Sequence, residues 1–217
     1  MPKTVIGTLC SMYVNAGNLG LPIATYVLGD AALVAPVLLL QLLLLQPVAM
    51  AVLDHSTAPE GFSPGLLVRR TLTNPLMMGA LIGLALALTR VTMPALVRAP
   101  IELVGGMAVP AMLLAYGVSL RLGPRPGAGI SAAEVGLIVT LKLAVQPLAA
   151  YFVGRSVLGL DDASLFAVAV LAALPTAQNI FVHAARYNRG VVVARDTIFL
   201  TTVLSVPALL VIAGLLA

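Results

Sequence analysis

The chain has 217 residues, of which 60% are hydrophobic and 9% are charged, with 12 Lys and Arg against 8 Asp and Glu. An ordinary soluble domain carries about 25% charged residues, and a domain of this size has too little interior to bury so much apolar surface. The composition therefore excludes a soluble globular domain and a disordered chain, and the single cysteine, Cys10, excludes a disulfide scaffold.

Charges and turn residues divide the chain into seven apolar segments, each close to the length of about 20 residues that a helix needs to span a bilayer. The sequence therefore predicts an all-α membrane protein with seven transmembrane helices. The predicted spans, in chain order, are residues 4–29, 31–53, 72–89, 101–120, 131–154, 163–185 and 196–217. The pair Asp161-Asp162 marks a helix start before the sixth span, because carboxylates are favoured in a first turn.

Basic residues in the connectors predict how the chain is oriented. One side receives eight of them and the other side three, and the side with more lies in the cytoplasm. The eight are Lys3, Arg69, Arg70, Arg121, Arg125, Arg186, Arg189 and Arg195, and the three are Arg90, Arg98 and Arg155. We expect a multi-pass protein of the cell membrane, plasma or inner, with a cytoplasmic N-terminus, an outside C-terminus and no nucleic-acid partner. Residues 66–70 of the longest connector, 54–71, suit a short interfacial helix.

Two predicted spans are interrupted by proline, glycine and side-chain amides near the middle of the membrane. Proline removes a backbone donor and breaks a helix, and a pair of such spans in corresponding positions is typical of a transporter site between inverted repeats. Plain proline kinks are the structural alternative. The interruptions read Asn15-Ala16-Gly17-Asn18-Leu19-Gly20-Leu21-Pro22 and Ala173-Leu174-Pro175-Thr176-Ala177-Gln178-Asn179.

The spacing of the interrupted spans predicts an inverted repeat. They lie five spans apart, and an odd offset gives them opposite orientations across the membrane. Each is followed by one connector and one final apolar helix. We therefore expect residues 72–217 to form a complete five-helix repeat and residues 1–53 to be the last two helices of another, joined by the cytoplasmic loop 54–71. Three helices of that first repeat are expected to precede Met1.

The motif at residues 15–22 resembles the fourth-helix motif of the auxin efflux carrier family of bacterial permeases, relatives of the plant PIN-type carriers. Further motifs follow in the family's order along essentially the whole chain. They are Asn74-Pro75, Pro110 with Tyr116-Gly117-Val118-Ser119-Leu120, Lys142 with Pro147, and Leu174-Pro175-Thr176-Ala177-Gln178-Asn179. The resemblance implies a ten-helix fold of two inverted repeats, in which the fourth and ninth helices are broken and cross. This chain would supply helices four to ten. The resemblance also implies transport of small organic anions, such as auxin-like or dicarboxylic acids.

The resemblance further implies that the crossing amides and prolines line a substrate site. Amides offer both donors and acceptors without a permanent charge, and half-helix N-termini after Pro22 and Pro175 would aim backbone N–H groups at an anion. The alternative is that the amides only bridge helices, which stabilises by about 0.6 kcal/mol per hydrogen bond. The predicted substrate-binding residues at the crossing are Asn15, Asn18, Pro22, Pro175, Gln178 and Asn179.

Lys142 is the only basic residue deep inside a predicted span. A central lysine costs about 2.5–3.5 kcal/mol, so it needs a partner, and no acidic residue is predicted at a similar depth. That partner is a substrate carboxylate or an acid on a further helix; alternatively, the ammonium takes the place where related folds hold a sodium ion. Gln146 lies one turn later on the same face and joins the predicted site. His183 is either a proton relay or an interfacial polar residue.

The sequence contains none of the motifs HExxH, GxSxG, GxxxxGK[ST] or GxGxxG, so an enzyme is not expected. No cofactor and no metal site are predicted. The expected function is secondary-active transport of a small organic anion by alternating access, driven by the proton gradient, with sodium as the other candidate coupling ion. Three alternatives stay open: a truncated, non-transporting fragment, an interaction partner of another membrane subunit, and a channel. The oligomeric state also stays open, with a homodimer as one arrangement.

Overall fold

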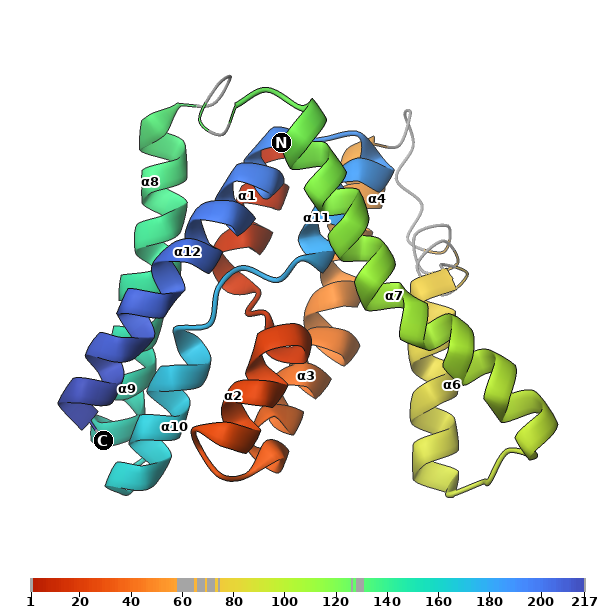
Figure 1. Cartoon of the computed structure of the whole chain (residues 1–217), viewed down its shortest axis with the longest axis horizontal. Coiled ribbons are helices and arrows are strands. Elements are labelled where there is room, and N and C mark those ends of the chain that lie inside the picture. The colour runs from red at the N-terminus through yellow and green to blue at the C-terminus, as the bar shows by residue number, and fades with distance from the viewer. Residues whose placement is uncertain are drawn as a thin grey trace.

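The computed structural model describes residues 2–57, 75–125 and 131–216, together with the single residues 65, 69, 73 and 127. Within these residues the fold is helical, and the only extended pairing is one isolated antiparallel bridge between Val14 and Thr176 (Figure 1). The predicted interfacial helix at 66–70, apart from Arg69, and the residue Asn74 lie outside the described residues.

Four continuous helices in the described part are long and apolar enough to cross a membrane, by length and composition. They are Ala31–His55, which includes α3 (Ala35–Leu40) and all but the last two residues of α4 (Gln46–Thr57); α7 (Ala95–Leu122); Ala132–Ser156, which includes α8 (Ala132–Thr140) and α9 (Gln146–Ser156); and α12 (Val191–Leu216). A shorter apolar helix, α6 (Pro75–Thr89), precedes α7.

The two spans predicted to be interrupted are each built from two shorter helices. The first consists of α1 (Pro2–Met12), a π-helical turn (Ala16–Gly20) and α2 (Leu21–Tyr26). The second consists of α10 (Asp162–Ala172) and α11 (Asn179–Tyr187). The interruptions meet in the interior of the bundle, where the chain between α10 and α11 passes the chain between α1 and α2 (Figure 1).

Three π-helical turns interrupt the described helices, and each ends two residues before a proline. Proline cannot donate to the carbonyl four residues earlier and clashes with it. A π turn widens the helix by one residue and moves that carbonyl aside, which lets the helix continue without a sharp kink. The turns are Ala16–Gly20 before Pro22, Gln41–Leu45 before Pro47, and Leu141–Val145 before Pro147.

The predicted helix start at Asp161-Asp162 is confirmed. The Oδ1 atom of Asp161 accepts a hydrogen bond of 3.0 Å from the backbone N of Ser164, which caps the first turn of α10. Hydrogen bonds from Ser164 also lower the pKa of Asp161, because they favour its ionised form.

Helix α7 starts six residues before the predicted span, at Ala95. This stretch was predicted to be a connector because it contains the charged residue Arg98. In the structure Arg98 lies inside α7, and its Nε donates to the carboxylate of Glu102 over 2.6 Å, one turn later. Oppositely charged residues four apart support a helix, so the two charges extend the helix instead of ending it.

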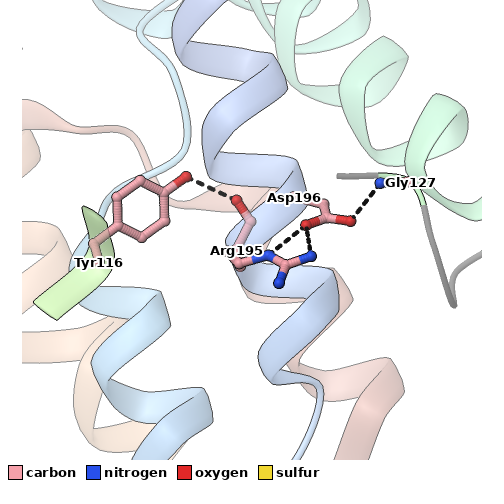
Figure 2. Close-up of polar contacts among 4 residues, drawn as sticks. All are labelled: Tyr116, Gly127, Arg195 and Asp196. Carbon is pink, nitrogen blue, oxygen red and sulfur yellow. Dashed lines mark hydrogen bonds and ion pairs between the residues drawn. The ribbon is translucent and has the colours of Figure 1, made fainter. Parts of the chain in front are cut away.

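The prediction that Arg195 lies in a cytoplasmic connector is wrong. Arg195 and Asp196 lie inside α12 with 2% and 0% of their surfaces exposed, and their side chains form an ion pair of 2.6 Å. Figure 2 shows the carboxylate of Asp196 between this guanidinium and the backbone N of Gly127, which donates to it over 2.8 Å. The hydroxyl of Tyr116, on α7, donates to the carbonyl of Arg195 over 2.8 Å. The pair thus joins α7 and the following connector to α12.

Helices α6 and α7 extend away from the other helices, and α7 packs on α11 and α12 near its C-terminal end (Figure 1). Tyr116 contacts Phe181 of α11 edge to face, with ring centroids 5.5 Å apart, and both pack against Ile198 of α12. A side chain at Gly123, just after α7, would collide with the guanidinium of Arg195. This small contact holds the α6–α7 pair to the rest of the described chain.

The substitution Asp196→Asn should destabilise the protein strongly. It leaves the guanidinium of Arg195 buried without a compensating charge, which costs about 3–5 kcal/mol. Thermal unfolding in detergent measures the effect. The matched control is Glu102→Gln, whose ion pair with Arg98 is 59% exposed on the Glu102 side and contributes about 0–1 kcal/mol. Equal losses of stability in the two variants would contradict the burial of the Arg195–Asp196 pair.

Candidate functional site

The two interrupted segments pair with each other through their backbones. The N–H of Asn15 donates to the carbonyl of Pro175 over 2.8 Å, and the N–H of Ala177 donates to the carbonyl of Tyr13 over 3.2 Å. Breaking a helix frees such groups, and a buried backbone group without a partner is costly. Non-helical backbone at membrane depth survives only where it is buried in protein or lines a cavity. Each interruption therefore supplies the partners that the other one needs.

Thr176 anchors the crossing to two further helices. Its Oγ1 donates to the carbonyl of Cys10, at the end of α1, over 2.6 Å, and its backbone N donates to Oγ1 of Thr201 on α12 over 3.1 Å. The hydroxyl of Thr201 in turn donates to the carbonyl of Thr197 over 2.7 Å. Thr176, Thr197 and Thr201 have no exposed surface. Thr176 stood in the predicted interruption without a role of its own, and Thr197 and Thr201 were not predicted, because a threonine in an apolar helix carries no distinctive pattern.

Gln41 supports the first interruption from the neighbouring helix. Its Nε2 donates to the carbonyl of Val14 over 3.1 Å, and the hydroxyl of Tyr13 donates to the carbonyl of Gln41 over 3.2 Å. This role of Gln41 was not predicted from the sequence. The available signal was that Gln41 and Gln46 are the only strongly polar side chains in a charge-free predicted span.

The predicted amides of the two segments are brought together in part. The Oδ1 of Asn15, a residue only 4% exposed, accepts from the backbone N of Asn18 over 3.3 Å and so caps the π turn. The Nδ2 of Asn18 donates to Oε1 of Gln178 over 2.9 Å, which links the two segments directly. Asn179 starts α11, and its buried Oδ1 has no hydrogen-bond partner among the described residues.

The two predicted prolines differ in position. Pro175 is buried at the second interruption, and its carbonyl accepts from Asn15. Pro22 is exposed in the first turn of α2, a position that tolerates proline, and the helix runs on through it from the π turn. The first half-helix therefore begins at Ala16, after Asn15, and the expectation of an N-terminus after Pro22 is wrong.

Lys142 has no exposed surface, and its ammonium group is held by neutral acceptors. Its Nζ donates to Oε1 of Gln146 over 2.8 Å and lies 3.4 Å from the carbonyl of Met12. Nε2 of Gln146 donates to the same carbonyl over 3.4 Å. Met12 is the last residue of α1, where carbonyls lack helical partners and the helix dipole is negative. No carboxylate within the described ranges forms an ion pair with Lys142.

A cavity of about 1000 Å³ opens beside this lysine, between the first interruption, α3, the π turn after α8, and α10. Its wall is mainly apolar, and its polar lining comes from Ser11, Asp30, Gln41, Gln146 and Ser164. Of the eight predicted site residues only Gln146 lines this cavity. The structure therefore divides the predicted site into two parts: a lysine–amide group beside the cavity, and the amide pair of Asn18 and Gln178 across the crossing.

His183 lies on α11 with 2% of its surface exposed, and both ring nitrogens lack hydrogen-bond partners among the described residues. It is thus buried among neighbouring side chains, and both of its predicted roles, proton relay and interfacial polar residue, stay predictions. In the described part of the chain, no group of three or more His, Cys, Asp or Glu residues is arranged to hold a metal ion.

The comparisons with known proteins identify the class. Residues 62–213 match the family described as "Membrane transport protein". A relative from Rhizobium meliloti named "Putative malonate transporter" is 32% identical over 200 residues, which cover 89% of this chain and 61% of the relative. The chain thus spans about three fifths of that relative's length. It belongs to the auxin efflux carrier family of membrane transport proteins, and the family indicates a transport protein of the membrane rather than an enzyme.

The substitution Thr176→Val should weaken the crossing. It removes the hydroxyl that donates to Cys10 and leaves a buried carbonyl without its partner, which costs about 1–3 kcal/mol. Thermal unfolding in detergent measures the loss. The matched control is Thr202→Val, because the buried Oγ1 of Thr202 has no partner among the described residues. A loss in Thr202→Val as large as in Thr176→Val would contradict this assignment.

Proposed function

We propose that the chain moves a small organic anion across the cell membrane by alternating access, driven by the proton gradient. The observation that carries the proposal is the antiparallel crossing of two interrupted helices next to a buried lysine and a cavity. Transporters built from inverted repeats place their substrate sites at such broken helices. A lysine that has no carboxylate partner in the described part of the chain favours an anionic substrate over a cationic or neutral one.

The proposed topology has seven transmembrane segments, four continuous, two broken at the crossing, and the short α6. In this proposal residues 72–217 form one five-helix repeat, residues 1–53 end the other, and the N-terminus is cytoplasmic. The arrangement in Figure 1 supports an odd number of crossings, because α1 begins near the end of the bundle opposite to the end where α12 stops.

A short dicarboxylate is the first substrate to test. The relative from Rhizobium meliloti carries malonate in its name. In the proposed site Lys142 attracts one carboxylate, and the amide of Gln41 offers a donor at the wall of the cavity. Asn15, Asn18, Pro175, Gln178 and Asn179 form the crossing that holds this wall in place, with Pro22 in the following helix. The Oδ1 of Asn179 is buried and has no hydrogen-bond partner among the described residues.

Coupling to protons is proposed because two titratable basic groups, Lys142 and His183, are buried near the crossing. Moving a proton on or off such a group changes the charge of the site as the substrate passes. Sodium coupling is the alternative, and the transport assay below separates the two.

Purified protein in proteoliposomes should take up radiolabelled malonate when a proton gradient is imposed. Lys142→Met should reduce uptake about tenfold or more, because a hydrogen bond to a charged group contributes about 1.5–3 kcal/mol. The matched control is Lys3→Met, which removes the other lysine of the chain, half exposed and paired with Glu134. Lys3→Met should transport like the unmodified chain.

Two outcomes of this assay count against the proposal. Uptake that persists after the proton gradient is collapsed, but stops without sodium, would rule out proton coupling. Flux that never saturates with malonate would indicate a channel.

A further inference from the structure

Gln146 separates the buried lysine from the cavity. Gln146 and Met12 both line the cavity, whereas Lys142 does not line it and has no exposed surface. The three groups form one small network, in which Lys142 and Gln146 both reach the carbonyl of Met12. A ligand in the cavity can contact the ammonium group of Lys142 only when the side chain of Gln146 moves.

Gln146 accepts a hydrogen bond from Lys142 that would be stronger if a carboxylate accepted it. Its Oε1 lies 2.8 Å from Nζ of Lys142, the distance expected between an ammonium group and a carboxylate oxygen. An amide oxygen carries only a partial charge, so it leaves the buried ammonium without a full counter-charge, and a buried charge needs pairing. A carboxylate would supply that counter-charge at the same position.

The other end of the Gln146 side chain is held weakly. Its Nε2 donates to the carbonyl of Met12 over 3.4 Å, at the long limit for an N–H···O hydrogen bond. Gln146 itself is half-buried and faces the cavity. The side chain therefore has room to turn into the cavity, and breaking its long hydrogen bond to Met12 costs little free energy.

The pair lies at a π turn that is followed by a proline. Lys142 lies in the π turn Leu141–Val145, and Gln146 lies between that turn and Pro147. The chain contains the same arrangement a second time: the π turn Gln41–Leu45 is followed by Gln46 and Pro47, with Leu42 in the place of the lysine. The second copy offers a natural control, because it has the same glutamine and proline without the ammonium group.

We infer that Gln146 is an internal substitute for the substrate: its side-chain oxygen occupies the position that a substrate carboxylate takes on Lys142, and substrate must displace it to bind. This inference rests on the proposed function, in which the substrate is a small organic anion. It assigns to Gln146 a positioning role that sets the affinity, because every substrate molecule competes with an amide that is already in place.

Malonate uptake kinetics test the inference with two substitutions. Gln146→Met keeps the length of the side chain but removes the competing acceptor, so the KM for malonate should fall roughly tenfold, the factor that one charged hydrogen bond represents. Gln146→Glu attaches a carboxylate permanently, so uptake should fall at least about tenfold while the melting temperature stays equal or rises. The control Gln46→Met should leave the KM within about twofold.

The direction of the KM change decides the outcome. A higher KM in Gln146→Met, in the same direction as in Lys142→Met, would mean that Gln146 binds the substrate itself, and an unchanged KM would mean that it never blocks Lys142. Either result overturns the inference while saturable uptake by the unmodified chain keeps the proposed function intact. A failure of the proposed function looks different, because the unmodified chain then shows no saturable malonate uptake.

Discussion

The structure depends on one constraint: backbone groups in an apolar environment must find partners within the protein. Pro175 and the stretch around Asn15 break two helices where no water is expected. The breaks are tolerated because they face each other, as the bonds from Asn15 to Pro175 and from Ala177 to Tyr13 show. Hydroxyls of Thr176 and Thr201 and the amide of Gln41 satisfy further groups. The crossing is therefore a single cooperative unit, and neither broken helix has these partners alone.

The same constraint explains where the buried lysine lies. Ending α1 at Met12 leaves a carbonyl at the negative end of a helix, inside the protein. Lys142 and Gln146 come from a distant part of the sequence to this carbonyl. The broken helix thus creates the acceptor that holds a cation, and the cation lies behind the wall of a cavity. The end of α1 at Met12 therefore positions Lys142, the group that would attract an anion.

Charged residues predicted the helix boundaries poorly, because a charge inside a helix of a membrane protein can either be exposed near the end of the helix or be buried in an ion pair. Arg98 and Arg195 were both assigned to connectors, yet both lie in helices. Arg98 is exposed near the start of α7 and pairs along its own helix, whereas Arg195 is buried and pairs with Asp196, whose other oxygen binds Gly127. The pattern of apolar residues does not distinguish these two cases, because the outcome depends on which residues lie nearby in space.

The sequence alone determined the helical membrane class, the two interrupted segments and the isolation of Lys142, because these follow from composition, from proline and from the lack of nearby acids. It also predicted Gln146 beside Lys142, since residues four apart share a helix face. Only the tertiary structure decided which groups meet: Asn18 with Gln178, Thr176 with Cys10, and Lys142 with Met12. These pairs lie 130 or more residues apart along the chain, and packing across the crossing, rather than any local pattern, brings them into contact.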